Sequence, residues 1–136
     1  PEPTLAADHE HTLQAGELIS AITLPLSTAA RASAYLKLRD RASFQFALLS
    51  LAVVLETDEG KVSHARLAAG GVGTRPWRLR ASEAALLGQP AGPGTWQAAV
   101  AASTQGAQAL PGNAFKLELL QRCVAHELAR HMGDVS

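Results

Sequence analysis

The chain has 136 residues, of which 12 are basic and 12 acidic, so its formal net charge is zero. With 47% hydrophobic and 18% charged residues, it has the composition of one folded domain rather than of a disordered segment. Because the net charge is zero, the chain has no general attraction for nucleic acid, and we expect no nucleic-acid partner. It also has no apolar run of about 18 residues, the length that a membrane-spanning helix needs, so we expect no membrane as a partner.

The amino-terminal region predicts a linker and two strands. Residues 1–15 are polar, begin with Pro1 rather than Met, and are expected to be a linker from a preceding domain, which leaves 16–136 as the domain itself. Residues 17–24 carry β-branched side chains and end before a proline, which predicts a first strand. Residues 32–38 alternate around Tyr35 and predict a second strand.

A hairpin is predicted next. Residues 46–56 are nearly all apolar, which is typical either of a central strand covered on both faces or of a buried helix. The turn signal Thr57-Asp58-Glu59-Gly60 favours the strand, because residues 61–69 alternate and can pair back on it. Gly70-Gly71-Val72-Gly73 then predicts a tight exit from the sheet.

The remaining sequence predicts three helices. Residues 78–87 are rich in Ala and Leu and form a short helix that Gly88 ends. Thr95 is expected to cap a second helix that ends near Pro111, and Asn113 a third. The third helix has apolar residues at helical spacing, namely Leu117, Leu120, Val124 and Leu128.

Strands followed by helices indicate an α+β fold. We expect a small antiparallel sheet of three to four strands followed by three helices packed on one face. Parallel βαβ alternation is absent, and the glycine run has Pro76 where a dinucleotide loop would have its third glycine. Both observations argue against a Rossmann domain.

Two patterns near the carboxyl end resemble catalytic motifs without meeting their requirements. A zinc-protease helix needs histidines four residues apart, whereas His126 has Arg130 at that position and His131 one residue further, so we expect no metal site. Cys123 and His126 could be a nucleophile and its base, but the amphipathic helix around Cys123 favours a packing residue, and we expect no catalytic residue in the domain. A single cysteine also excludes an internal disulfide and fits a reducing compartment.

The most unusual stretch is charged and lies between two apolar runs, without Gly or Pro. It contains Lys37, Arg39, Asp40 and Arg41. These charges either pair among themselves in a solvated bend or present donors to an anionic or hydrogen-bonding cofactor. Periodicity alone leaves both readings open.

Five short motifs together resemble a known family. The chain is similar, from residue 13 to the final helix, to the C-terminal domain of the flavoprotein (medium) subunit of molybdenum hydroxylases, which include the xanthine dehydrogenase, carbon monoxide dehydrogenase and aldehyde oxidoreductase types. The motifs are Gly16-Glu17-Leu18-Ile19, Lys37-Leu38-Arg39-Asp40-Arg41-Ala42-Ser43-Phe44, Ala65-Arg66-Leu67-Ala68-Ala69-Gly70-Gly71-Val72, Arg75-Pro76-Trp77-Arg78 and Leu110-Pro111-Gly112-Asn113-Ala114-Phe115-Lys116.

The resemblance implies a cofactor and a site. In the family, the segment that matches residues 37–44 lies beside the flavin ring of FAD. The implied cofactor-binding residues are therefore Lys37, Arg39, Asp40, Arg41, Ser43 and Phe44. Arg75, Trp77 and Arg78 are expected to contact a neighbouring domain or subunit.

The resemblance also implies partners. The family enzyme hydroxylates an aldehyde or N-heterocycle at a molybdopterin centre in its large subunit, and electrons pass through the [2Fe-2S] clusters of a small subunit to FAD and on to an acceptor. Most of the FAD is held by a domain N-terminal to this one, so this domain alone is expected neither to retain FAD tightly nor to catalyse a reaction. The implied location is the cytoplasm, or the periplasm for an exported complex. The alternative is a protein-interaction domain that keeps the fold without a flavin.

Overall fold

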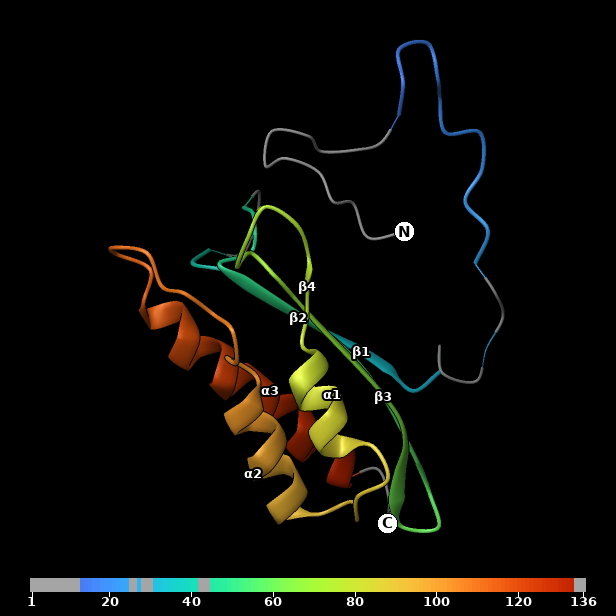
Figure 1. Cartoon of the computed structure of the whole chain (residues 1–136), viewed down its shortest axis with the longest axis vertical. Coiled ribbons are helices and arrows are strands. Elements are labelled where there is room, and N and C mark those ends of the chain that lie inside the picture. The colour runs from blue at the N-terminus through green and yellow to red at the C-terminus, as the bar shows by residue number, and fades with distance from the viewer. Residues whose placement is uncertain (1–12, 25–26, 28–30, 42–44, 134–136) are drawn as a thin grey trace.

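The structure is a computed structural model and describes residues 13–24, 27, 31–41 and 45–133. Four antiparallel strands in the order β1-β2-β3-β4 are followed by three helices, which confirms the predicted α+β class (Figure 1). The elements are β1 (Ser33–Leu38), β2 (Leu49–Asp58), β3 (Lys61–Gly70), β4 (Trp77–Arg78), α1 (Arg80–Leu86), α2 (Pro93–Ala102) and α3 (Phe115–Gly133).

The hairpin between β2 and β3 forms as predicted. Glu59 and Gly60 occupy its two-residue turn with φ angles of 47° and 74°, as the favoured hairpin turns require. A bulge near the turn makes Val62 pair with Thr57 and His64 with Glu56. The extra residue reverses the alternation of β3, so that Val62 and Ala65 both face the core.

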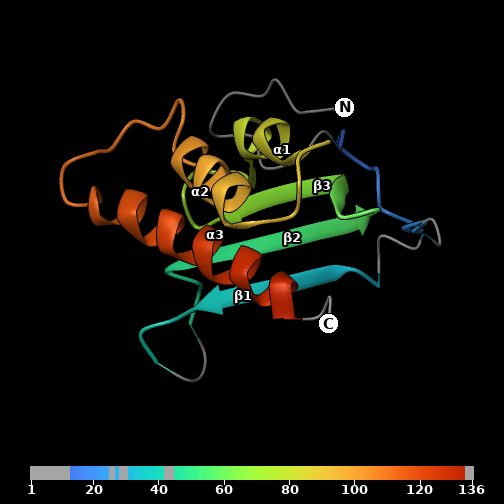
Figure 2. The same cartoon turned by 90° about the horizontal axis from the view of Figure 1, so that it is seen from below.

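All three helices cover one face of the sheet (Figure 2). The β2 residues Leu49, Leu51, Val53 and Leu55 are buried toward them, whereas Ala52 between them is exposed. The expectation that this strand is covered on both faces is therefore wrong. Alternation is hard to see in the sequence because the open face also carries small apolar residues.

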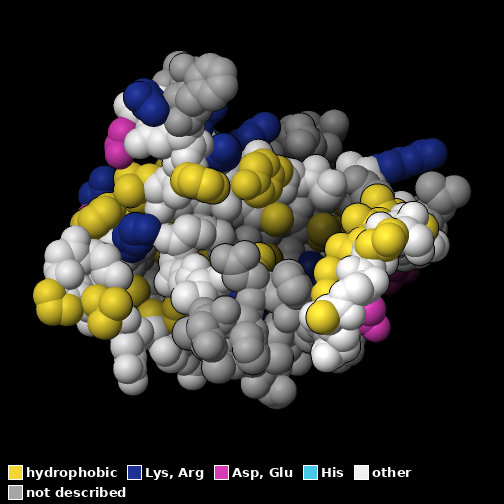
Figure 3. Space-filling view, turned by 90° about the horizontal axis from the view of Figure 1, so that it is seen from above, with side chains coloured by type: hydrophobic (Ala, Val, Ile, Leu, Met, Phe, Trp, Pro, Cys, Tyr) yellow, Lys and Arg dark blue, Asp and Glu magenta, His cyan; other side chains and the backbone are white. Residues whose placement is uncertain are grey.

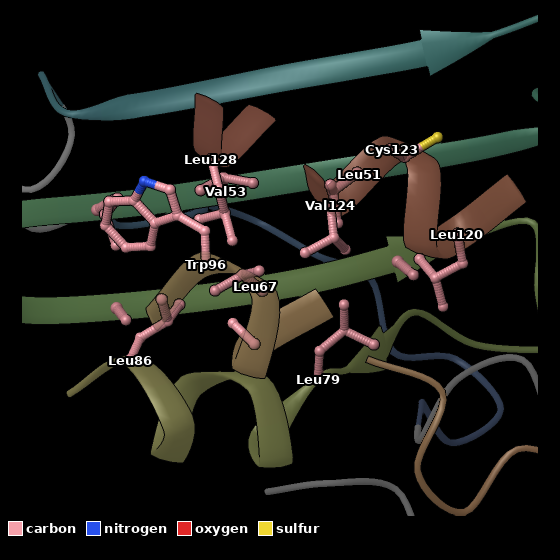
Figure 4. Packing of buried hydrophobic residues seen from close by; sticks show 14 of the residues in the cluster. Leu51, Val53, Leu67, Leu79, Leu86, Trp96, Leu120, Cys123, Val124 and Leu128 are labelled. Atoms are coloured by element: carbon pink, nitrogen blue, oxygen red, sulfur yellow. The ribbon is translucent and has the colours of Figure 1, made fainter. Parts of the chain in front are cut away.

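The core lies between the sheet and the helices (Figure 4). α1 packs on β3 and α3 packs on β2 and β1, while α2 bridges the other two helices. The Ser82 hydroxyl of α1 donates to the Ala99 carbonyl of α2 at 2.7 Å. The helical side of the core is formed by Leu86, Trp96, Ala99, Leu120, Val124 and Leu128.

The helix boundaries differ from those predicted. Trp77 and Arg78 belong to β4, so α1 starts at Arg80. α2 begins at Pro93, which needs no N–H partner in a first turn. It ends at Ala102, where the Ser103 hydroxyl donates to the Val100 carbonyl, and it does not continue toward Pro111.

The α3 cap also differs from the prediction. The Asn113 side chain accepts a hydrogen bond from the Leu110 N–H at 2.8 Å. This bond closes the preceding turn, so the side chain does not cap α3 as expected. Within the described residues, no helix is long and apolar enough to cross a membrane.

Residues 17–24 do not form the predicted first strand. They run outside the sheet and stand away from the helices in both views (Figures 1 and 2). A strand needs a neighbour to satisfy its backbone groups, and no described strand pairs with this segment. The sequence pattern is that of a strand, but this domain provides no place for it.

The outer edge of β3 is covered at both of its ends. β4 pairs with Ala68 and Ala69. At the other end, the loop after α1 runs beside the start of β3: the Val62 N–H donates to the Gln89 carbonyl at 2.9 Å, and the Gly88 N–H donates to the Val62 carbonyl at 2.8 Å. Both ends of β3 therefore have hydrogen-bond partners on this side as well as on the β2 side.

Gly71 fixes the turn after β3. Its φ is +74°, and a Cβ built on it would lie 3.1 Å from the carbonyl oxygens of both Ala47 and Leu48. The sequence expectation of a tight exit at the glycine run is confirmed here. The turn packs closely against the end of the β1–β2 loop, so the two loops are held together.

We predict that Gly71→Ala destabilises the domain by about 2 kcal/mol, because an L-residue is strained at positive φ and the added methyl group meets backbone atoms. The control is Gly73→Ala, because a Cβ at Gly73 would lie 3.7 Å from its nearest neighbour, the Arg75 carbonyl oxygen, and the φ of Gly73 lies outside the left-handed region. Urea unfolding measures both variants, and equal stabilities for the two would contradict the role given to Gly71.

Candidate functional site

The charged stretch becomes the loop between β1 and β2. Lys37 is exposed near the end of β1, and Arg39, Asp40 and Arg41 follow the strand directly, all exposed. The Arg41 N–H donates to the Gln45 side chain at 3.0 Å, which folds the loop back on itself. Ser43 and Phe44, the other two predicted cofactor-binding residues, lie outside the described residues.

Lys116 joins this loop region from a distant part of the chain. Its Nζ, at the start of α3, donates to the Gly71 carbonyl at 2.5 Å. Gly71 in turn packs against Ala47 and Leu48 at the end of the β1–β2 loop. The contact therefore brings α3, the β3–β4 turn and the charged loop to one end of the sheet.

A cleft of about 750 Å³ opens beside the β3–β4 turn. It lies between this turn, the start of α1 and the end of α2. Its charged and aromatic lining consists of Arg75, Trp77, Arg78 and Arg80. The sequence singled out the first three of these residues, and the structure does bring them to one cleft. Arg80, which the sequence places beside Trp77 with Arg75 and Arg78, lies in the same cleft.

Glu83 of α1 holds one wall of this cleft in place. Its Oε1 accepts hydrogen bonds from the Leu67 N–H and from Arg78 Nε, both at 2.9 Å, and its Oε2 accepts from Arg78 Nη2 at 2.8 Å. Burial acts to raise the pKa of Glu83, but the Arg78 and Leu67 hydrogen bonds and the charges of Arg78 and Arg66 outweigh it and hold the pKa below its ordinary value. The carboxylate therefore stays charged and ties β3, β4 and α1 together.

Basic side chains are spread over this end of the molecule. Figure 3 views it from above and shows Lys and Arg side chains of the described residues at several places. Exposed residues of the charged loop and residues of the cleft both contribute basic groups. Guanidinium groups in such an arrangement can bind carboxylate, phosphate or carbonyl oxygens.

The carboxyl-terminal patterns at Cys123 and His126 do not have the geometry of a catalytic or metal site. Cys123 is buried, and burial together with the negative charge of Glu127 raises the pKa of its thiol. His126 is 61% exposed and lies 3.8 Å from Glu127, which is itself buried. Within residues 13–24, 27, 31–41 and 45–133, no three His, Cys, Asp or Glu side chains gather as a metal site.

Comparisons with known proteins place the chain in a family. The family model of the CO dehydrogenase flavoprotein C-terminal domain matches residues 33–124. The chain is 40% identical over 120 residues to the aldehyde oxidoreductase FAD-binding subunit PaoB of Escherichia coli (strain K12). The match covers 88% of this chain and 34% of that subunit, so the chain spans about a third of the length of this relative.

Solved structures give the same grouping. Carbon monoxide dehydrogenase from Hydrogenophaga pseudoflava is 29% identical with a TM-score of 0.58, over 74% of this chain and 36% of that one. Quinoline 2-oxidoreductase from Pseudomonas putida 86 has a TM-score of 0.62 over 73% of this chain and 36% of that one. At 20% identity, the second likeness shows the fold alone.

We predict that Glu83→Gln destabilises the domain by about 2 kcal/mol at neutral pH, because a charged hydrogen-bonded group is lost from a partly buried site. Since the folded-state pKa is lowered, the stabilisation by Glu83 is fully present above the unfolded-state value of about 4.3 and is lost as the pH falls through the folded value. Unfolding between about pH 3 and 7 measures it.

The control for this prediction is Glu118→Gln. Glu118 pairs with Arg122 on the surface, where its side chain is 67% exposed, so the change should cost less than about 0.5 kcal/mol. If the stability of Glu83→Gln falls with pH as steeply as that of the unchanged protein, Glu83 is not the group responsible.

We predict that the Cys123 thiol is unreactive in the folded domain. Its raised pKa leaves little thiolate at pH 8, and its burial blocks reagents, so labelling by a thiol-specific disulfide reagent should be at least about tenfold slower than in the unfolded chain. Rapid labelling of the folded domain would instead support a nucleophilic cysteine.

Proposed function

The chain belongs to the CO dehydrogenase flavoprotein C-terminal domain family, and we propose that it is the C-terminal domain of the FAD-binding subunit of a molybdenum hydroxylase of the aldehyde or xanthine oxidoreductase type. In this role it helps to enclose an FAD that passes electrons from [2Fe-2S] clusters to an acceptor. The observation that carries the proposal is the 40% identity, over 120 residues, to an aldehyde oxidoreductase FAD-binding subunit.

The residues of the charged loop fit a flavin edge. FAD supplies a ring that accepts and releases electrons, and its carbonyl oxygens, ring nitrogens and diphosphate accept hydrogen bonds or carry negative charge. Arg39 and Arg41 are exposed donors on a loop whose base is fixed by the Arg41–Gln45 hydrogen bond. We assign them to the flavin edge, with Lys37, Asp40, Ser43 and Phe44 completing the contact.

The loop would act on the flavin through charge and access. A guanidinium beside the ring favours its reduced, more negative form, because opposite charges attract. A loop lying over the ring also limits which acceptors reach it. Neither role requires a nucleophile or a general base in this domain.

The partners follow from the same proposal. The first is an N-terminal FAD-binding domain of the same subunit, joined through residues 1–15 to the domain formed by 16–136. The others are a molybdopterin-containing large subunit and a small subunit with [2Fe-2S] clusters. The cleft lined by Arg75, Trp77 and Arg78 is suited to contact one of them, since Arg and Trp are enriched where proteins bind one another.

We predict that Arg41→Ala in the full-length subunit weakens FAD binding by about tenfold, the effect of losing one charged hydrogen bond. The flavin potential should become more negative because a nearby cation is removed. Flavin titration and reductive titration measure the two effects.

Arg122→Ala is the matched control, because it removes an exposed cation that pairs with Glu118 on α3. If both variants keep the flavin affinity, potential and acceptor turnover of the unchanged subunit, the β1–β2 loop has no role at the flavin. A full-length protein that purifies without FAD would instead favour an interaction domain that retains only the fold.

A further inference from the structure

Residues 17–24 expose an unusual amount of apolar surface. Leu18, Ile22 and Leu24 are 78%, 79% and 80% exposed, and Ile19 is 65% exposed. Isolated apolar residues on a surface are normal, but four large ones within a short segment mark a surface that binds something. The backbone of the segment leaves the body of the domain (Figure 1).

Most of the backbone of the segment also forms no hydrogen bond with other described residues. The Gln14 N–H donates to the Glu17 side chain at 2.8 Å, and the Glu17 N–H donates to the Gln14 carbonyl at 3.1 Å. These two bonds form a turn at its start. Beyond them, no backbone hydrogen bond joins residues 18–24 to another described residue.

The sequence of the segment is that of a strand with apolar residues on both faces. Leu18, Ile22 and Leu24 fall on one side of an extended chain with Ser20, and Ile19 falls on the other with Ala21 and Thr23. β-branched residues are frequent, and a proline follows directly, as at a strand end. An interior strand of a sheet has this pattern.

The sheet of this domain gives the segment no suitable place. The outer edge of β1 has no described strand beside it, and the segment does not lie there. All three helices cover one face of the sheet (Figure 2), so a strand added at this edge would leave its apolar side chains in water on the other face. The family match also begins at residue 33, after the segment.

We propose that residues 17–24 form a strand in a sheet of the FAD-binding domain that precedes this one in the full-length subunit. The inference rests on the proposed function. The relative PaoB is about three times as long as the part that matches this chain, which provides room for such a sheet. Strand addition satisfies the backbone of the segment and buries its apolar side chains at once. It places the boundary of the C-terminal domain near residue 31 rather than at 16.

Amide hydrogen exchange in the full-length subunit and in the 136-residue chain tests the proposal. We expect residues 18–24 to exchange at least about 100-fold more slowly in the full-length subunit, since sheet amides open rarely. Fast exchange in both proteins would overturn it. Slow exchange in the 136-residue chain at every concentration would show pairing within this domain, and slow exchange only at high concentration would show pairing with a second copy; both would also overturn it.

A matched pair of variants tests the side chains. Ile22→Asp in the full-length subunit puts a charge where the strand is buried, and should return residues 18–24 to the fast exchange of the shorter chain. Ser27→Asp adds the same charge at an exposed position outside the segment and should leave exchange slow. Protection of β2 and α3 in the same measurement shows that the domain stays folded. Slow exchange in Ile22→Asp would exclude the buried strand.

The FAD content of the same samples separates the two proposals. Bound FAD with fast exchange of residues 18–24 would overturn the strand and leave the proposed function standing. Slow exchange without FAD would support strand addition to a preceding domain and would overturn the flavin assignment.

Discussion

The hydrogen bonds of the Glu83 carboxylate fix how β3, β4 and α1 meet. β4 is only two residues long, and it leaves the Leu67 N–H on the edge of β3 without a strand neighbour. Glu83 takes that position and at the same time binds Arg78 through two hydrogen bonds. A side chain thus completes the sheet where its last strand ends, and the chain can turn directly into α1. The cleft beside β4 has its shape because of this connection.

The loops at one end of the sheet are held together by a few contacts around Gly71. Gly71 has no side chain, so the β3–β4 turn can lie against Ala47 and Leu48, and Lys116 holds the turn from α3. The charged loop is thereby fixed at its base, while Arg39 and Arg41 remain exposed. In the role that we propose, such a domain would contribute charge and shape to a cofactor site that it shares with the preceding domain.

The three longer strands, the hairpin and the one-sided helical layer could be predicted, because alternation, a turn signal and helical spacing are local. The strand predicted at 17–24 does not form, and the two-residue β4 was not predicted. The open face of the sheet could not be predicted, since Ala52 and Val54 are as apolar as core residues. Long-range pairs were also hidden: Lys116 and Gly71 are 45 residues apart, and Glu83 and Arg78 look like ordinary surface charges. Of the predicted flavin residues, Lys37, Arg39, Asp40 and Arg41 lie together at one end of the sheet. Sequence position alone could not show the cleft beside them.

The covered edge of β3 has a consequence for aggregation. An exposed strand edge is a template on which other chains can add strands. Here one stretch is paired with β4, Leu67 is occupied by a carboxylate, and the start of the strand is bound by the loop after α1. A strand that pairs with an edge exposes a new edge of unpaired donors and acceptors on its other side, whereas a side chain or a loop exposes no such edge. These contacts leave less of the β3 edge open to pairing with another chain.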